Sequence, residues 1–139
     1  MKIYVKIALG VVLLLVIVII GVALYYYNLK PKDLREVKPD FFLSATELQQ
    51  AFDLNEADAT TKYVNKVVEV TGEILSAKPG EKGSYNIALK TGNESSMVNC
   101  NFPVLSDPEA FHVGDSITLR GVCSGYLMDV LLNNCVAVK

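Results

Sequence analysis

Catalytic and metal-binding patterns are missing from this sequence. Its 139 residues include a single histidine, His112, and three cysteines without C-x-x-C spacing. A zinc site needs several such ligands at short spacings, so we expect neither a metal nor a redox motif. A nucleophile elbow and a phosphate-binding glycine loop are also absent, and a lone histidine in a turn is typical of a surface residue. We therefore expect no cofactor and no enzymatic activity.

Charge is missing from one long stretch. Residues Ile7 to Leu24 contain no charged or strongly polar side chain. Extended through three tyrosines to residue 27, the run would form a helix of about 30 Å, which matches the hydrocarbon core of a bilayer. Tyrosines at its end and lysines on both sides are typical of the two membrane interfaces. After an N-terminal tail of residues 1–6, we expect residues 7–27 to span the lipid bilayer.

Two interpretations exist both for the cleavage of this helix and for its orientation in the membrane. The small-x-small triplet at residues 21–23 would allow cleavage as a signal peptide, but the apolar run is long for one and bulky residues follow, which favours an uncleaved anchor. More basic residues follow the helix than precede it, which by the positive-inside rule would place the C-terminal part in the cytoplasm. A very short tail before one apolar helix is instead typical of a signal-anchor. We predict a single-pass protein whose soluble part lies outside the cytoplasm.

Charge is distributed unevenly along the chain. Residues 1–39 carry six Lys or Arg against two Asp or Glu, a net charge of +4, whereas residues 40–139 carry seven against thirteen, a net charge of −6. An acidic domain is a poor partner for a nucleic-acid phosphate backbone. Residues 28–43 contain Pro31, Pro39 and mixed charges, and we expect a juxtamembrane linker there. The remaining residues, 44–139, have the length of one small domain.

Local patterns predict a mainly β domain that begins with short helices. Ser44 and Glu47 form a capping-box pattern, and Asn55 has the features of a second N-cap, so one or two short helices are expected up to about Tyr63. From Lys66 the apolar period changes to two, and turn signals separate the strands. A bend-forming Gly72 in a long first strand favours a five-stranded OB-fold barrel. The expected strands cover residues 66–77, 85–90, 97–102, 116–123 and 129–138, with a loop around Ser124–Asp129.

A family resemblance supports this fold. The segment C123-x-G125-Y126-x-x-D129-V130-x-L132-x-x-C135, together with V98-x-C100-x-F102 and G114-D-S-I-T-L-R-G121 before it, resembles the tRNA_anti-like OB-fold family. Members are small bacterial domains, often behind a membrane anchor or export signal. The resemblance covers roughly residues 44–139 and implies the OB fold and a location in the cell envelope; with the signal-anchor topology, we expect the domain in the periplasm. It implies no established activity, because a fold does not determine a function.

A polar strand face is the candidate binding surface. OB folds bind ligands on strands two and three and on the loop between strands four and five. We expect Asn86, Asn99 and Asn101 to point outward there, with Tyr126 in the loop. The strands carry no outward aromatic residue and one outward basic residue, Lys90, whereas single-stranded nucleic acids require stacking platforms and a basic groove. Such a face could suit a sugar or a protein strand, or be a solvated surface. We predict a non-catalytic envelope module that binds a protein or small ligand; the alternative is a single-stranded nucleic-acid-binding domain facing the cytoplasm.

The three cysteines are expected to be structural. For a domain outside the cytoplasm, the oxidising environment favours a disulfide bond. We expect the bond between Cys123 and Cys135, which requires a bulge that the adjacent Asn133 and Asn134 could supply. A Cys100–Cys135 bond is the second alternative, because strands three and five are neighbours in an OB barrel. Three buried free thiols are the third.

Overall fold

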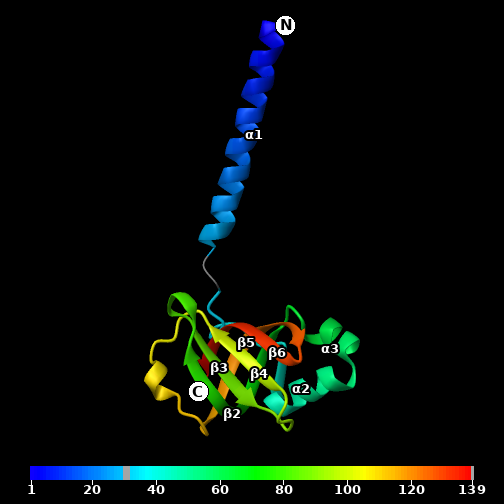
Figure 1. The fold of residues 1–139 in the computed structure, drawn as a ribbon, viewed down its shortest axis with the longest axis vertical. Coiled ribbons are helices and arrows are strands. Elements are labelled where there is room, and N and C mark those ends of the chain that lie inside the picture. Colours follow the sequence, from blue (N-terminus) through cyan, green and yellow to red (C-terminus); the bar gives the residue numbers. More distant parts are fainter. Residues whose placement is uncertain (30–31, 139) are drawn as a thin grey trace. The chain divides into compact units, whose positions relative to one another are not determined.

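The computed structural model describes residues 1–29 and 32–138 and consists of two compact units that divide near residue 31 (Figure 1). The first unit is the helix α1 (Lys2–Asn28), in which no residue is buried. By length and composition α1 is able to cross a membrane. The predicted span of residues 7–27 lies within it. An apolar helix without a protein partner is suited to a lipid environment, since its backbone hydrogen bonds are satisfied internally.

The second unit is a closed barrel of five strands with one additional strand (Figure 1). Along the sheet the order is β1-β2-β3-β4-β6-β5, and β5 pairs again with β2, which closes the barrel. Strands β2 to β6 confirm the predicted OB-fold architecture. The strands are β1 (Phe41–Ser44), β2 (Val67–Pro79), β3 (Tyr85–Lys90), β4 (Met97–Phe102), β5 (Ser116–Leu127) and β6 (Asp129–Val138). Two 3-10 turns, η1 (Glu81–Gly83) and η2 (Pro108–Ala110), lie in the connections.

Two short helices precede the barrel strands, as predicted. They are α2 (Ala45–Leu54) and α3 (Glu56–Tyr63). The capping box is present: the Ser44 hydroxyl accepts from the Glu47 amide at 3.1 Å, and the Ser44 amide donates to the Glu47 carboxylate at 2.8 Å. The Asn55 side chain caps α3 by accepting from the Asp58 amide at 3.2 Å. These caps satisfy amides that a helix N-terminus leaves without intrahelical partners.

Helix α2 packs its apolar side against the barrel. It contacts β1, β2, β3, β4 and β6, and its Leu48 and Phe52 are buried in the common core. Gly72 permits this approach, because a Cβ at that position would lie 3.0 Å from the Cβ of Ala45. The predicted bend in the strand lies three residues later, where the β2–β3 register shifts between Ile74 and Ser76.

The segment before α2 is attached to the barrel, which the sequence patterns did not indicate. Strand β1 runs parallel to β2, with Phe41 opposite Val68. Leu34 is 3% exposed, although it lies within the expected linker of residues 28–43. The side chain of Arg120 donates to the backbone carbonyls of Leu34, Arg35 and Val37 at 3.0, 3.1 and 2.6 Å. Part of this segment is therefore an integral piece of the folded domain.

The connection between β5 and β6 is much shorter than the expected loop at Ser124–Asp129. β5 continues to Leu127 and β6 begins at Asp129, so the prediction of a loop there was wrong. Met128 forms the tight turn with a positive φ of 66°. The register shifts between Cys123 and Gly125, and this bulge lets the strand bend and continue beyond the point where its alternating pattern ends.

Candidate functional site

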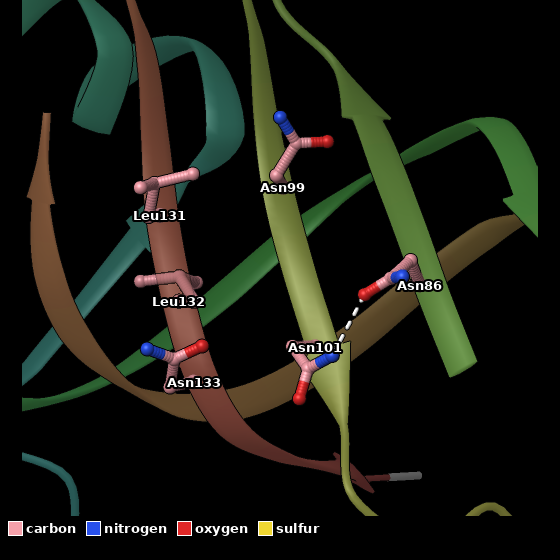
Figure 2. A pocket seen from close by; sticks show the side chains of 6 residues that line it. All are labelled: Asn86, Asn99, Asn101, Leu131, Leu132 and Asn133. Carbon is pink, nitrogen blue, oxygen red and sulfur yellow. Dashed lines mark hydrogen bonds between the residues drawn. The ribbon is translucent and has the colours of Figure 1, made fainter. Parts of the chain in front are cut away.

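The outer face of β3, β4 and β6 carries a shallow groove that we call the asparagine groove (Figure 2). Its volume is about 430 Å³. Three of the four residues predicted to form a binding face, Asn86, Asn99 and Asn101, lie in this groove, and Tyr126 does not. The lining residues are Asn86, Asn99, Asn101, Leu131, Leu132 and Asn133.

Strand alternation explains why the asparagines share one face. In β4 the residues Val98, Cys100 and Phe102 are buried, so the intervening Asn99 and Asn101 point outward. Antiparallel pairing with β3 places Asn86 opposite Asn101, and the Asn101 amide nitrogen donates to the Asn86 oxygen at 2.8 Å (Figure 2). The sequence pattern was sufficient to predict this part of the site.

Asp129 fixes the side chain of Asn99. One Asp129 oxygen accepts from the Met97 backbone amide at 2.9 Å, and the other accepts from the Asn99 amide nitrogen at 3.0 Å. β4 and β6 run parallel here, with Asn99 opposite Leu131, so the first residue of β6 reaches the start of β4. An ionised carboxylate only accepts hydrogen bonds, so Asn99 must turn its NH₂ group toward Asp129.

Asn133 is a groove residue that the binding-face prediction did not include. It lies next to a bulge in β6, where Val122 pairs with Asn133 but Arg120 pairs with Val136. Asn134 in the bulge has a positive φ of 54°, which asparagine tolerates better than most residues. The Asn133 amide nitrogen donates to the Ser124 hydroxyl at 2.6 Å, which holds the side chain over the sheet. The Asn-Asn pair indicated the bulge but not which of the two side chains faces the groove.

Tyr126 belongs to a different cluster. Its hydroxyl donates to the Asp53 carboxylate at 2.8 Å, and its ring stacks on Phe52 with centroids 5.3 Å apart. The hydrogen bond to Asp53 raises the pKa of Tyr126, because the neutral phenol donates it and ionisation would remove the donor. The residue thus connects β5 to α2, and one face of its ring is already occupied.

The cysteines lie in the core as free, buried thiols. Cys123 pairs with Leu132 rather than with Cys135, so the strand register does not favour the first expected bond. The pKa of Cys100 is raised well above its usual value by burial and by the adjacent Cys135 thiol. Cys135 also approaches Gly121, where a Cβ would lie 2.7 Å from its sulfur. The Cys100–Cys135 disulfide stays a prediction, and these two are the neighbouring thiols.

His112 lies on the surface, with its side chain 73% exposed and Nδ1 3.5 Å from an Asp115 oxygen. Within residues 1–29 and 32–138, no three His, Cys, Asp or Glu side chains are grouped as metal ligands. The asparagine groove is lined by neutral amides and leucine. Amides neither transfer protons near neutral pH nor act as nucleophiles, so the groove is chemically suited to binding.

Comparison with solved structures supports the fold. A lipoprotein from Klebsiella pneumoniae subsp. pneumoniae with a proposed nucleic acid-binding function superposes with a TM-score of 0.60 at 23% identity. The match covers 79% of this chain and 100% of that chain. At this identity the likeness concerns the fold alone. No curated protein matches the sequence.

Two weaker similarities carry no functional argument. A chain of the S. pombe Stn1–Ten1 complex has a TM-score of 0.39 at 11% identity, covering 52% of this chain and 58% of that chain. A proposed aspartyl-tRNA synthetase from Leishmania major Friedlin has a TM-score of 0.47 at 10% identity, covering 86% of this chain and 26% of that chain.

A family model provides the assignment that these distant structures do not. The tRNA_anti-like model matches residues 1–136, which is nearly the whole sequence. The match agrees with the closed five-stranded barrel and with the sequence resemblance in its last two strands. This chain belongs to the tRNA_anti-like family.

Proposed function

We propose that this protein is a membrane-anchored, non-catalytic binding module of the bacterial cell envelope, and that the asparagine groove holds its ligand. The observation that carries the proposal is the convergence of four asparagine side chains on one hollow in the outer face of β3, β4 and β6. Small-ligand sites typically combine a concave surface with a few oriented polar groups. The face also corresponds to the one on which OB folds bind their ligands.

The membrane anchor in this proposal is α1. Its apolar length suits a bilayer, and tyrosines and lysines near its ends suit the interfaces. In this proposal α1 is an uncleaved signal-anchor and the barrel lies in the periplasm. A C-terminal fusion to alkaline phosphatase, paired with a matched fluorescent-protein fusion, tests this. Phosphatase activity without fluorescence is expected, and the reverse pattern would place the barrel in the cytoplasm.

The groove's chemistry supports binding rather than catalysis. The Asp129 carboxylate contacts one of the groove asparagines, and both of its oxygens already accept hydrogen bonds, from Met97 and Asn99. A general acid or base would need an available titratable group beside the ligand. The asparagine side chains can orient a ligand without altering its bonds.

Photo-crosslinking tests whether the groove is occupied. Leu131 is a half-buried lining residue on β6, and its replacement by p-benzoylphenylalanine places a photoreactive group over the groove. Val113 is 68% exposed in the connection before β5 and provides a matched control position. Irradiation of cells making the full chain should give a defined adduct at position 131 and none at position 113. Equal labelling at both positions, or none at 131, would contradict the proposal.

A further inference from the structure

Three of the four amides of the asparagine groove are oriented in the same sense. An asparagine side chain has an NH₂ group that donates and a carbonyl oxygen that accepts. In three of the four, one N–H of the NH₂ group donates inside the protein: Asn99 donates to Asp129, Asn101 to Asn86 and Asn133 to Ser124. Among the described residues, no group donates to the side-chain oxygens of these three asparagines. Their oxygens are therefore acceptors that are left for a ligand.

The fourth asparagine is oriented in the opposite sense. Asn86 uses its oxygen to accept from Asn101, which leaves its NH₂ group. That nitrogen lies against the turn before β3, since a Cβ on Gly80 would be 2.9 Å from it. The groove thus presents three side-chain oxygens that accept no hydrogen bond within the described residues, together with N–H groups of its amides (Figure 2).

We infer that the ligand of the asparagine groove is a saccharide, a neutral molecule that donates several hydroxyl hydrogen bonds. This inference rests on the proposed function and specifies the ligand class. Sugar hydroxyls can donate to the oxygens of Asn99, Asn101 and Asn133. The aliphatic side chain of Leu131 lies beside them and offers an apolar surface to the C–H face of a sugar ring (Figure 2).

Nucleic acid fits the groove poorly on the same grounds. Phosphodiester oxygens are acceptors, so they cannot satisfy carbonyl oxygens. The lining residues include neither a basic side chain to bind phosphate nor an aromatic ring to stack a base. The net charge of −6 on residues 40–139 adds a general repulsion of polyanions.

A peptide strand fits poorly for a different reason. Peptides that extend a sheet bind at a free edge, where main-chain groups are unpaired. Strand β4, in the middle of the groove, already pairs with β3 on one side and β6 on the other. Recognition on this face must therefore come from side chains, among them the oxygens of Asn99, Asn101 and Asn133.

Titration calorimetry with two neutral tetrasaccharides tests the inference. Cellotetraose donates through hydroxyls alone, and chitotetraose adds acetamide N–H groups. The full chain should be held in lipid nanodiscs, because maltoside detergents carry a sugar headgroup that would compete. Binding of at least one of the two is expected, with an affinity that changes little between low and high salt, since no ionic contact is involved. Co-sedimentation with insoluble envelope glycan distinguishes a polymeric source from a free oligosaccharide.

Variants locate the binding. Asn101→Leu and Asn133→Leu each remove one acceptor at similar volume, and each should weaken saccharide binding about fivefold to tenfold, the usual consequence of one lost hydrogen bond. Lys90→Leu is the control, because Lys90 is an outward residue of β3 that does not line the groove. It should leave saccharide affinity unchanged. Near-UV circular dichroism confirms that each variant is folded.

The contrary outcomes separate the two proposals. An adduct at position 131 without saccharide binding would overturn the saccharide inference and leave the binding function standing. Absence of both would overturn both. Saccharide affinity that is unchanged in Asn101→Leu and Asn133→Leu would remove the groove as the site. Salt-dependent retention of a labelled oligothymidylate that falls in Lys90→Leu would indicate nucleic acid instead.

Discussion

Two polar clusters on the outer surface of the barrel use their hydrogen-bonding groups in opposite ways. In the first, which we call the Arg120 cluster, Arg120 pairs with Glu69 at 2.7 Å across β5 and β2, and donates to three carbonyls of the segment before β1. Both charged side chains are less than one-fifth exposed. In the asparagine groove, the amides are half-buried or exposed and keep acceptors free. Polar groups that are fully paired stabilise a fold, and those left over are available to a ligand.

The largest expected effect is on stability, in the Arg120 cluster. Arg120→Ala removes the partner of a mostly buried carboxylate and leaves the carbonyls of residues 34, 35 and 37 without this donor. We expect the free energy of unfolding to fall by about 2–4 kcal/mol. Thermal melts of the full chain in nanodiscs, followed by near-UV circular dichroism of the tyrosines, measure this. Ligand binding by the folded protein should be unaffected.

Glu69→Gln is a milder change in the same cluster and serves as a control. It keeps the shape of the side chain and one acceptor for Arg120, so its loss of stability should be smaller than that of Arg120→Ala. A larger loss in Glu69→Gln would mean that the carboxylate charge, rather than attachment of the preceding segment, carries the stability.

Asp129 both pairs with a backbone amide of the fold and orients Asn99 in the asparagine groove, and it provides the second prediction. In Asp129→Asn the new side chain can still accept from the Met97 amide, but it then turns an NH₂ group toward Asn99. Asn99 is expected to reverse and present its own NH₂ group to the groove. Stability should fall by about 1 kcal/mol, because the two charge-assisted hydrogen bonds to the carboxylate, from Met97 and Asn99, become neutral. Saccharide affinity should fall about fivefold, as an acceptor becomes a donor.

Calorimetry and thermal melts on the same Asp129→Asn sample check both parts. Unchanged saccharide affinity with reduced stability would show that Asn99 is a structural residue only. Such a result would restrict the binding surface to Asn101 and Asn133.

Asn101→Leu is the converse of Arg120→Ala and is the third prediction. The Asn101–Asn86 hydrogen bond is exposed, so its loss should change the free energy of unfolding by no more than about 0.5 kcal/mol. Binding should weaken as described above. A melting temperature that falls as much as in Arg120→Ala would remove the distinction between the two clusters.

Local sequence signals predicted most of the fold. The charge-free run predicted α1, the Ser44–Glu47 box predicted the start of α2, and period-two alternation predicted the five barrel strands. Alternation also placed Asn99 and Asn101 on one face, because that inference needs only the strand itself. These features depend on residues close together in the chain, which a single sequence can show.

Features that depend on distant partners were not predictable. Docking of the segment around Leu34 requires Arg120, more than eighty residues later. The grouping of Tyr126 with Asp53, rather than with the asparagines, depends on where α2 packs. The inclusion of Asn133 in the groove depends on a register shift that the Asn133–Asn134 pair permits but does not place. Each of these follows from tertiary packing rather than from a local pattern.

Tyr126 provides the smallest predicted effect, because its cluster is paired internally but lies near the surface. The Asp53 carboxylate accepts from the Tyr126 hydroxyl, which raises the pKa of Tyr126 above its unfolded value. The neutral phenol therefore stabilises the fold fully at pH values below the ordinary tyrosine pKa of about 10, and this contribution is lost as pH rises through the higher folded pKa.

Tyr126→Phe tests this contribution. The variant has no hydroxyl at this position, so it has no such stabilisation to lose at high pH. The difference in melting temperature between wild type and Tyr126→Phe should be constant from neutral pH to about pH 9 and shrink at higher pH. Tyr85→Phe, which alters a partly buried tyrosine at the start of β3, is the control for the loss of a phenol hydroxyl. A Tyr126 difference that stays constant to the highest pH at which the barrel folds would mean that the bond to Asp53 contributes nothing to stability, and that the stacking on Phe52 alone joins β5 to α2.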